Sequence, residues 1–449
     1  MSLNSKPPCD MNYFGYFLLL VLIFTCSTSC KKQSNGGPPK FITISRDSAA
    51  YNVPFTVTVD NFSPDKDTIK YNGVPCPIVS IQGSDISITI PKNAGPGYFT
   101  ITDGTTIVKG FLVYYINTSY VTTIAGSLDS GSVDGTGLAA SFLALDGVAL
   151  SSTGILYTTE FTGGNQYIDI YSASSRIRQI NAAGVVTTFS GSGHYGFKDG
   201  PASVAEFGEL GAIAIDAAGN LYVTDYYYNR IRKITSSGDV STIAGNGNAG
   251  FVDGPADSAS FNGPTGIAID NAGNVYVADN KNFAVRRIST NGMVTTLTST
   301  GFLALTDPGQ NHRTFASPWA LYLNRGNLLL GDNGFIWNIT PSGVLTVLAG
   351  VGPGYSEGPG YEVQFGRVEG LVADSHGNIY AADLDNGIIR EITSIGVTNF
   401  AGIAELLLPA AVDGPWQTAI FQSPSGLAID KDDNIYVADG YRLRKIFVQ

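Results

Sequence analysis

The segment Ala268-Ile269-Asp270-Asn271-Ala272-Gly273-Asn274-Val275-Tyr276-Val277-Ala278-Asp279 decides the fold, because versions of it return along the whole second part of the chain. The repeated segments end at six acidic residues, spaced 65, 54, 53, 51 and 56 residues apart: Glu160, Asp225, Asp279, Asp332, Asp383 and Asp439. A near-constant period of short alternating strands separated by tight turns indicates a repeat architecture.

Each repeat contains four strand-like pieces, which in the clearest copy are residues 266–270, 274–279, 284–288 and 294–297. Four antiparallel strands joined by short turns and repeated around a ring describe the blade of a β-propeller. The high content of glycine (54 residues) and of tyrosine and phenylalanine (23 each) also favours an all-β protein. The sequence therefore predicts an all-β fold dominated by a six-bladed β-propeller.

The two ends of the propeller predict how its ring closes. An outer-strand piece, Val121-Thr122-Thr123-Ile124-Ala125-Gly126, precedes the first inner strand, whereas the last repeat stops in its third strand at residues 442–447. The spare strand can complete the last blade and leave no open sheet edge.

Two further features resemble the NHL-repeat family. They are the linker that runs from Asp253-Gly254-Pro255-Ala256 to Phe261-Asn262-Gly263-Pro264, and Asn229-Arg230-Ile231-Arg232-Lys233-Ile234 after Asp225. The resemblance covers about 330 residues, is weakest around residues 300–340, and implies a propeller domain over residues 119–449.

Residues 40–117 have a different texture, with period-2 strands at 41–44, 55–59, 86–90 and 99–102 that predict a small β-sandwich. Asn61-Phe62, the turn Tyr71-Asn72-Gly73-Val74 and Gly95-Pro96-Gly97-Tyr98 resemble the immunoglobulin-like IPT/TIG family. That family consists mostly of spacer and interaction modules, so the resemblance implies no chemistry.

The N-terminus carries a targeting pattern. Residues 13–25 form an apolar run of signal-peptide length, and Ser27-Thr28-Ser29-Cys30-Lys31-Lys32 is similar to a bacterial lipoprotein cleavage site, although Ser27 stands where such sites usually have leucine. We expect a signal peptide over 1–29, lipidation of Cys30, a tether over 30–39 and an exported protein anchored in the bacterial envelope, in the outer membrane. An ordinary secretory signal with Cys30 as a bystander, and Cys26 as the anchor, are the alternatives.

Composition excludes several classes of function. A formal net charge of −11 disfavours a nucleic-acid partner, because phosphates repel an acidic surface. Three histidines, His194, His312 and His376, fall in two linkers and one turn of the opposite face, which argues against a three-histidine zinc site. Of the four cysteines only Cys76 lies in the folded part, so a cysteine-based zinc site or an internal disulfide is also excluded.

One residue per blade, just before the inner strand begins, should surround the mouth of the central channel. These channel-ring residues are Asp146, Gly211, Thr265, Trp319, Glu369 and Ser425. Asp146 and Glu369, with no obvious basic partner at the ring, flank Ser425 and could hold calcium through oxygen ligands. Glu369-Gly370-Leu371 also resembles the start of the gluconolactonase-like propellers, which bind a catalytic metal at this ring. Gly211, Thr265 and Trp319 depart from that family's ligand set, and a solvated channel mouth is the alternative.

The longer and more varied loops share one face, where binding residues are expected. This loop face carries Tyr226, Tyr227 and Tyr228 and the first-blade insertion, residues 161–167, and its aromatic rings suit sugars or peptides, or simply pack between blades. The repeated Asp-Gly-Pro units and the acidic strand ends are interpreted as structural hydrogen-bond acceptors.

Three classes of function remain open. The first is a lipid-anchored binding or scaffold protein whose loop face holds a glycan, peptide or protein. The second is a metal-dependent propeller hydrolase or lyase of small substrates, and the third is a purely structural envelope component. Whether the protein is an enzyme is not decided by the sequence, and the binding protein is the main hypothesis.

Overall fold

The computed structural model describes residues 38–45, 48–92, 97–116, 118–162, 174–299, 317–404 and 411–448. Cys30, the expected signal peptide, His312 and most of the first-blade insertion lie outside these ranges. The strands of the sandwich fall between Lys40 and Ile116, and those of the blades between Ser119 and Val448. The domain boundaries themselves stay predictions.

The first part of the chain is an immunoglobulin-like sandwich of two sheets. One sheet has the order β1 (Lys40–Ile44), β3 (Phe55–Asp60), β7 (Asp85–Ile88) and β6 (Ile78–Gln82). The other has the order β2 (Ser48–Ala50), β9 (Ile107–Ile116), β8 (Gly97–Thr102), β4 (Thr68–Tyr71) and β5 (Val74–Pro75). Alternate residues of β3 and β8 face a core that contains Phe55, Val57 and Phe99. The predicted hairpin is confirmed, because β4 pairs with β5 and Asn72 and Gly73 both have positive φ, as a type I′ turn requires.

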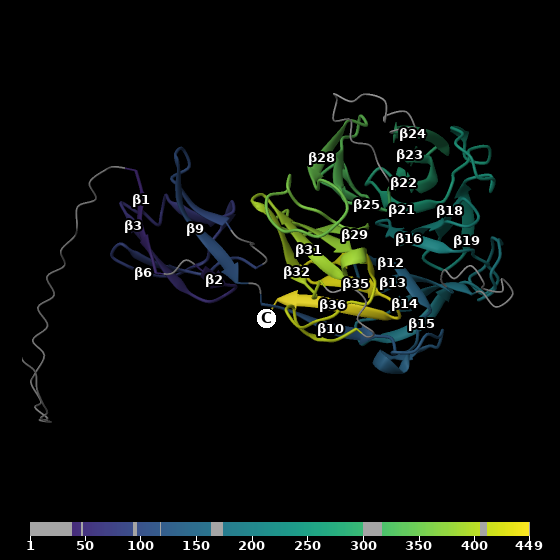
Figure 1. Cartoon of the computed structure of the whole chain (residues 1–449), viewed down its shortest axis with the longest axis horizontal. Helices are drawn as coiled ribbons and strands as arrows, with labels where there is room; N and C mark the ends of the chain where they lie inside the picture. Colours follow the sequence, from purple (N-terminus) through teal and green to yellow (C-terminus); the bar gives the residue numbers. More distant parts are fainter. Residues whose placement is uncertain are drawn as a thin grey trace, which may run out of the picture.

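The second part is a six-bladed propeller in the described residues (Figure 1). Blade 1 contains β12 (Ala144–Leu150), β13 (Leu156–Phe161), β14 (Ser175–Ile180), β15 (Val185–Ser190) and β11 (Gly135–Thr136). Blade 2 contains β16 (Leu210–Ile215), β17 (Leu221–Asp225), β18 (Arg230–Ile234) and β19 (Val240–Ala244). Blade 3 contains β21 (Pro264–Ile269), β22 (Val275–Asp279), β23 (Ala284–Ile288), β24 (Met293–Ser299) and β20 (Gly254–Pro255).

The remaining blades repeat this order. Blade 4 contains β25 (Ala320–Asn324), β26 (Asn327–Gly331), β27 (Ile336–Ile339) and β28 (Leu345–Ala349). Blade 5 contains β29 (Val368–Ala373), β30 (Ile379–Asp383), β31 (Ile388–Thr393) and β32 (Gly396–Ala401). Blade 6 contains β34 (Pro424–Ile429), β35 (Ile435–Asp439), β36 (Arg442–Val448), β10 (Ser119–Ala125) and β33 (Gly414–Pro415). Short 3₁₀ turns occupy Gly137–Ala139, Asn280–Asn282 and Leu384–Asn386.

The predicted closure is confirmed. Strand β10 from the start of the propeller pairs with the last strand, β36, in a register that runs from Ser119↔Val448 to Ala125↔Leu443. Figure 1 shows β10 and β36 side by side, where the start and the end of the propeller meet. The inner strands β12, β16, β21, β25, β29 and β34 contact one another in that order and back to β12, so the ring is complete.

In five blades a fully buried arginine forms an ion pair at the end of the blade that lies on the loop face. The arginines Arg178, Arg232, Arg286, Arg390 and Arg444 lie 2.9, 3.2, 2.8, 3.3 and 2.8 Å from the acidic strand-end residues Glu160, Asp225, Asp279, Asp383 and Asp439. In four blades the same guanidinium also pairs with the preceding linker aspartate: Asp134, Asp199, Asp253 or Asp413. Blade 4 has Trp337 instead, whose indole N–H donates to Asp332. The structural interpretation of both sets of acids is therefore confirmed, and their arginine partner is the part that the sequence analysis missed.

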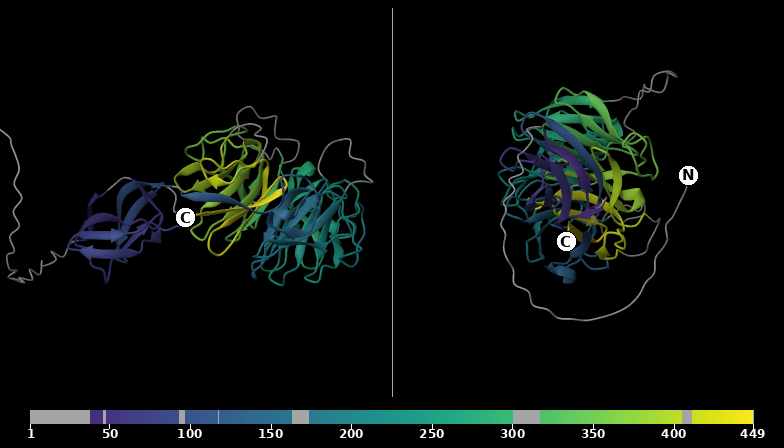
Figure 2. Two further views of the ribbon diagram at one scale, coloured as in Figure 1. Left: turned by 90° about the horizontal axis from the view of Figure 1, so that it is seen from below. Right: turned by 90° about the vertical axis from the view of Figure 1, so that its left-hand side faces the viewer.

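The sandwich and the propeller touch at the turn that follows β34. The Lys92 ammonium donates to the Asp432 carbonyl at 2.5 Å and to Asn434 Oδ1 at 3.4 Å. In Figure 2 the sandwich lies beside the rim of the propeller disc. No helix in the described residues is long and apolar enough to cross a membrane.

Candidate functional site

The channel-ring residues lie at the start of the inner strands, on the face that carries the linkers. In five blades the inner strand has a β-bulge at this position. Its residues before and after the bulge pair with the next strand of the blade, and the ring residue lies between them. Blade 4 has no bulge, and Trp319 directly precedes β25. A bulge turns a side chain out of the regular alternation, and this device is frequent beside functional sites.

Glycines just after the ring positions let neighbouring inner strands approach closely. A Cβ on Gly370 would lie 2.2 Å from the Ser425 carbonyl oxygen, and one on Gly426 would lie 2.4 Å from the Asp146 carbonyl oxygen. The channel is therefore narrow at the ring. Below it, aliphatic side chains from all six inner strands line a cavity of about 320 Å³ that opens toward the tight turns.

Ser425 and Thr265 connect blades across the ring. The Ser425 hydroxyl is buried and donates to the Asp146 carbonyl at 2.9 Å, while the Thr265 hydroxyl donates to the Pro318 carbonyl at 2.9 Å. Both side chains thus point into the wall between blades. Their contacts stabilise the ring, and the prediction that Ser425 contributes to binding has no contact in its favour here.

Three carboxyl groups and one arginine gather at the ring. Burial, together with the charges of Glu369 and Glu209, raises the pKa of Asp146 well above its usual range, against the lowering effect of Arg367. Burial raises the pKa of Glu369 to about 7, although the Arg367 guanidinium lies 3.0 Å from its carboxylate and opposes the shift. Burial also raises the pKa of Glu209, against the effect of Lys281. The prediction that neither Asp146 nor Glu369 has a basic partner is wrong, because Arg367 pairs with Glu369.

Cations and aromatic rings continue this cluster outward. The Arg367 guanidinium lies 4.8 Å from the Trp319 ring, and the Lys281 ammonium lies 4.8 Å from the Tyr226 ring. The structure therefore brings Trp319, Glu369 and Asp146 into one region of the loop face, and it adds Arg367 and Glu209 to them.

Tyr227 and Tyr228 belong to an aromatic cluster with Tyr195. The ring centroids of Tyr195 lie 5.5 Å from Tyr227 and 6.1 Å from Tyr228, and those of Tyr227 and Tyr228 are 5.2 Å apart. Tyr227 is 55% exposed, whereas Tyr195 and Tyr228 are half-buried. The charge of Glu209 contributes to raising the pKa of Tyr195, so the aromatic cluster lies next to the carboxyl groups of the channel ring. The Tyr227 ring is thus exposed to solvent, and the rings of Tyr195 and Tyr228 pack against it.

The ring fits calcium poorly. The raised pKa of Asp146 favours its protonated form, and a protonated carboxyl must lose its proton before it can ligate a cation. Arg367 already neutralises Glu369, and Ser425 is hydrogen-bonded to backbone carbonyls. No group of three acidic, histidine or cysteine side chains that could hold a metal occurs in the described part of the chain. His194 lies in a linker and His376 in the turn after β29, on the opposite face.

Arg367 and Glu209 could have been found from the sequence. Each stands two residues before a ring position, and residues i and i+2 of a strand face the same side. Both were missed because they precede the inner strands, which begin at Leu210 (β16) and Val368 (β29). Tyr195 lies in a linker, where neither periodicity nor turn chemistry predicts which side chains meet.

A family model described as "NHL repeat" matches residues 261–288 and 421–444. These segments run through the inner strands and the buried arginines of blades 3 and 6. The chain contains NHL repeats. The rest of the propeller repeats the same strand order with more divergent sequences.

Curated relatives share parts of the chain. It is 39% identical over 74 residues to SUPPRESSOR OF QUENCHING 1 of Arabidopsis thaliana and 26% identical over 278 residues to Teneurin-1 of Gallus gallus, which is 16% and 51% of this chain. The chain spans only 7% and 10% of the lengths of these two relatives.

Solved structures of similar fold cover nearly the whole chain. A Bacteroides thetaiotaomicron protein described as being of unknown function has a TM-score of 0.59 at 18% identity, over 92% of this chain and 99% of its own. An auxiliary nutrient binding protein from Bacteroides ovatus has a TM-score of 0.54 at 14% identity, over 92% and 98%. At these identities the likeness concerns the fold alone.

Proposed function

We propose that this protein is an exported binding protein of the bacterial cell envelope and that the loop face of its propeller binds a glycan. The observation that carries the proposal is the exposed Tyr227 ring, which packs on Tyr195 next to Glu209 of the carboxyl cluster. Aromatic faces pack on apolar faces of ligands, and protonated and ionised carboxyls together supply hydrogen-bond donors and acceptors. A sugar presents both kinds of surface at once.

Cell-envelope placement is supported by the nutrient-binding proteins of Bacteroides with the same overall fold. The Cys30 lipid anchor extends that proposal, with the IPT/TIG-like sandwich holding the propeller away from the membrane. A diacyl or triacyl cysteine would hold the protein stably, because each buried methylene contributes about 0.8 kcal/mol. Mass spectrometry of the mature N-terminus tests this anchor, and a Cys30→Ala variant that stays in the membrane fraction would contradict it.

A glycan array probed with the purified full chain tests the binding function. Wild-type protein should retain a defined set of glycans, and Tyr227→Ala should weaken their retention. A peptide array in parallel tests the other ligand class. Retention of peptides and no glycan would overturn the sugar assignment while keeping a binding role.

A metal-dependent hydrolase or lyase is the competing function, and calcium separates the two. If Asp146 and Glu369 formed a metal site, calcium would raise the melting temperature of the wild type, and Asp146→Asn with Glu369→Gln would abolish the rise. Because Arg367 pairs with Glu369, we expect no rise in the wild type. A calcium-dependent rise that the double variant loses would favour the enzyme.

A further inference from the structure

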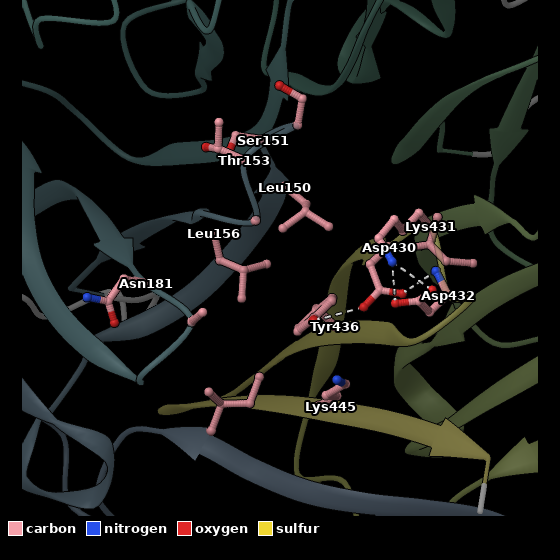
Figure 3. Close-up of a pocket in the computed structure, with 15 residues that line it drawn as sticks. Leu150, Ser151, Thr153, Leu156, Asn181, Asp430, Lys431, Asp432, Tyr436 and Lys445 are labelled. Atoms are coloured by element: carbon pink, nitrogen blue, oxygen red, sulfur yellow. Dashed lines mark hydrogen bonds and ion pairs between the residues drawn. The ribbon is translucent and has the colours of Figure 1, made fainter.

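A cavity with both apolar and charged walls lies on the face opposite the channel ring. This seam pocket, of about 640 Å³, lies between blades 6 and 1, where the first and last strands of the propeller meet (Figure 3). Its apolar wall is formed by Ile124, Leu150, Leu156 and Ile429, and its size is within the range of small-molecule sites.

A small side chain on the outer strand contributes to the open groove at this seam. The fourth position of each outer strand faces the next blade. In blades 1 and 5 it is Phe189 and Phe400, whose rings pack on Tyr157 and Tyr380 at centroid distances of 5.0 and 4.7 Å. In blade 6 the equivalent residue is Ile124, beside Tyr436. The smaller side chain leaves unfilled the space that a phenylalanine ring occupies in blades 1 and 5. Blade 2 has Ile243 at this position, and the cavity beside it is smaller, about 280 Å³.

The acidic groups of the seam pocket already have partners, and none of them forms an ion pair with Lys445. Both oxygens of Asp430 are engaged, since they accept the N–H groups of Asp432 and Asn434, the Asn434 side-chain amide and the Tyr436 hydroxyl. Asp432 pairs with Lys431 at 2.8 Å on the outer rim.

Lys445 differs from these groups. Its ammonium lies 5.5 Å from the Tyr436 ring, and no carboxylate of the described residues lies within ion-pair distance of it. At the same strand position, Arg287 donates to Asn274 and Glu391 is hydrogen-bonded to Tyr380. Lys233 of blade 2 lies over Tyr222 as Lys445 lies over Tyr436, but beside a smaller cavity. A half-buried ammonium beside an apolar wall is complementary to an apolar molecule that ends in one negative group.

We propose that the seam pocket binds a small organic carboxylate, with its aliphatic or aromatic body against Ile124, Leu150 and Leu156 and its carboxylate at Lys445. Asn181 lines the opposite side of the pocket, on blade 1, so Lys445 is the group that the carboxylate contacts. The Asp432–Asn434 turn beside the pocket is the one that Lys92 of the sandwich contacts, so that contact holds one wall in place.

Titration with phenylacetate tests the proposal, with 2-phenylethanol as the neutral probe of similar body. Isothermal calorimetry on the full chain should show saturable binding of phenylacetate and at least tenfold weaker binding of 2-phenylethanol. Lys445→Met should remove this preference for the carboxylate. Equal binding of the two probes by the wild type, or no saturable binding of phenylacetate up to its solubility limit, would overturn the proposal.

Filling variants locate the site. Ile124→Phe places in the seam pocket the ring that Phe189 and Phe400 place in other grooves, and it should weaken phenylacetate binding at least tenfold. Ile243→Phe makes the same change in the groove between blades 2 and 3 and should leave binding unchanged. Undiminished binding to a folded Ile124→Phe variant would show that phenylacetate binds elsewhere.

Discussion

At the scale of single residues, the buried arginine of five blades forms an ion pair whose acidic partner should contribute strongly to stability. Arg286 is fully buried and donates to Asp279 at 2.8 Å and to Asp253 at 2.6 Å. The Asp279 side chain is fully buried, whereas that of Asp253 is 48% exposed. Removing a buried partner leaves an uncompensated charge in the interior, while water replaces an exposed one.

We therefore expect Asp279→Asn to lower the free energy of unfolding by about 3–5 kcal/mol. Asp253→Asn should cost about 1 kcal/mol or less, since its carboxylate is partly solvated. Urea titrations of the two variants and the wild type measure the difference. Equal losses would show that the burial of the acid does not set its contribution.

Glu391 is an acid where blades 2, 3 and 6 have Lys233, Arg287 and Lys445, and it should make stability depend on pH. Burial, reinforced by the charge of Asp374, raises the pKa of Glu391 to about 8, although the Tyr380 hydroxyl lowers it. The folded protein therefore keeps a proton that the unfolded chain releases from a pKa near 4.5, so stability falls as the pH rises from there toward 8.

Glu391→Gln should remove this loss. Its melting temperature should equal that of the wild type at pH 4 and exceed it at pH 8, because a shift from 4.5 to about 8 corresponds to a gain of up to about 4 kcal/mol in the free energy of unfolding. Glu362→Gln, at an exposed position, serves as the control and should change little at either pH. A gain at pH 4 as large as that at pH 8 would contradict the assigned cause.

At the scale of secondary-structure elements, the closing strand β10 contributes a full strand to blade 6. Val121 and Ala125 on this strand are completely buried, and Val121 packs in the core between blades 5 and 6. Without β10, strand β36 would present an open edge.

Replacing residues 119–125 by a glycine-serine linker of equal length should therefore lower the melting temperature strongly. Burying Val121 alone is worth about 1.5–3 kcal/mol. A synthetic peptide of residues 118–126 should restore part of the loss, because it can occupy the same place beside β36. An unchanged melting temperature in the replaced variant would show that the ring closes without this strand.

The sequence predicted the strands and their order better than the contacts between side chains. The repetition of the blade explains this difference. Repetition gave six independent views of one blade, so strand order, closure and the ring positions of Asp146 and Glu369 could be read from spacing. Arg367 was missed because it precedes β29 and lies outside the strand pattern that the repeats share. The seam pocket was missed because residue types do not show how far a groove is filled: Ile124 and Ile243 occupy the same strand position beside cavities of about 640 and 280 Å³.

At the scale of the whole molecule, the propeller offers two separate chemical environments on its two faces. The loop face joins Tyr227 to the carboxyl cluster at the channel ring, and the face of the tight turns carries the seam pocket at Ile124. The narrow ring and the aliphatic channel separate them. A variant on one face should therefore leave binding at the other unchanged.

Calorimetric titration of a glycan retained on the array, with face-specific variants, tests the central claim most directly. Tyr227→Ala should weaken the affinity at least tenfold, about 1.4 kcal/mol, because it removes the exposed ring of the Tyr195–Tyr227–Tyr228 cluster. Ile124→Phe, on the opposite face, should leave the affinity unchanged. The account predicts this pattern, and a glycan affinity that Tyr227→Ala leaves intact would contradict it.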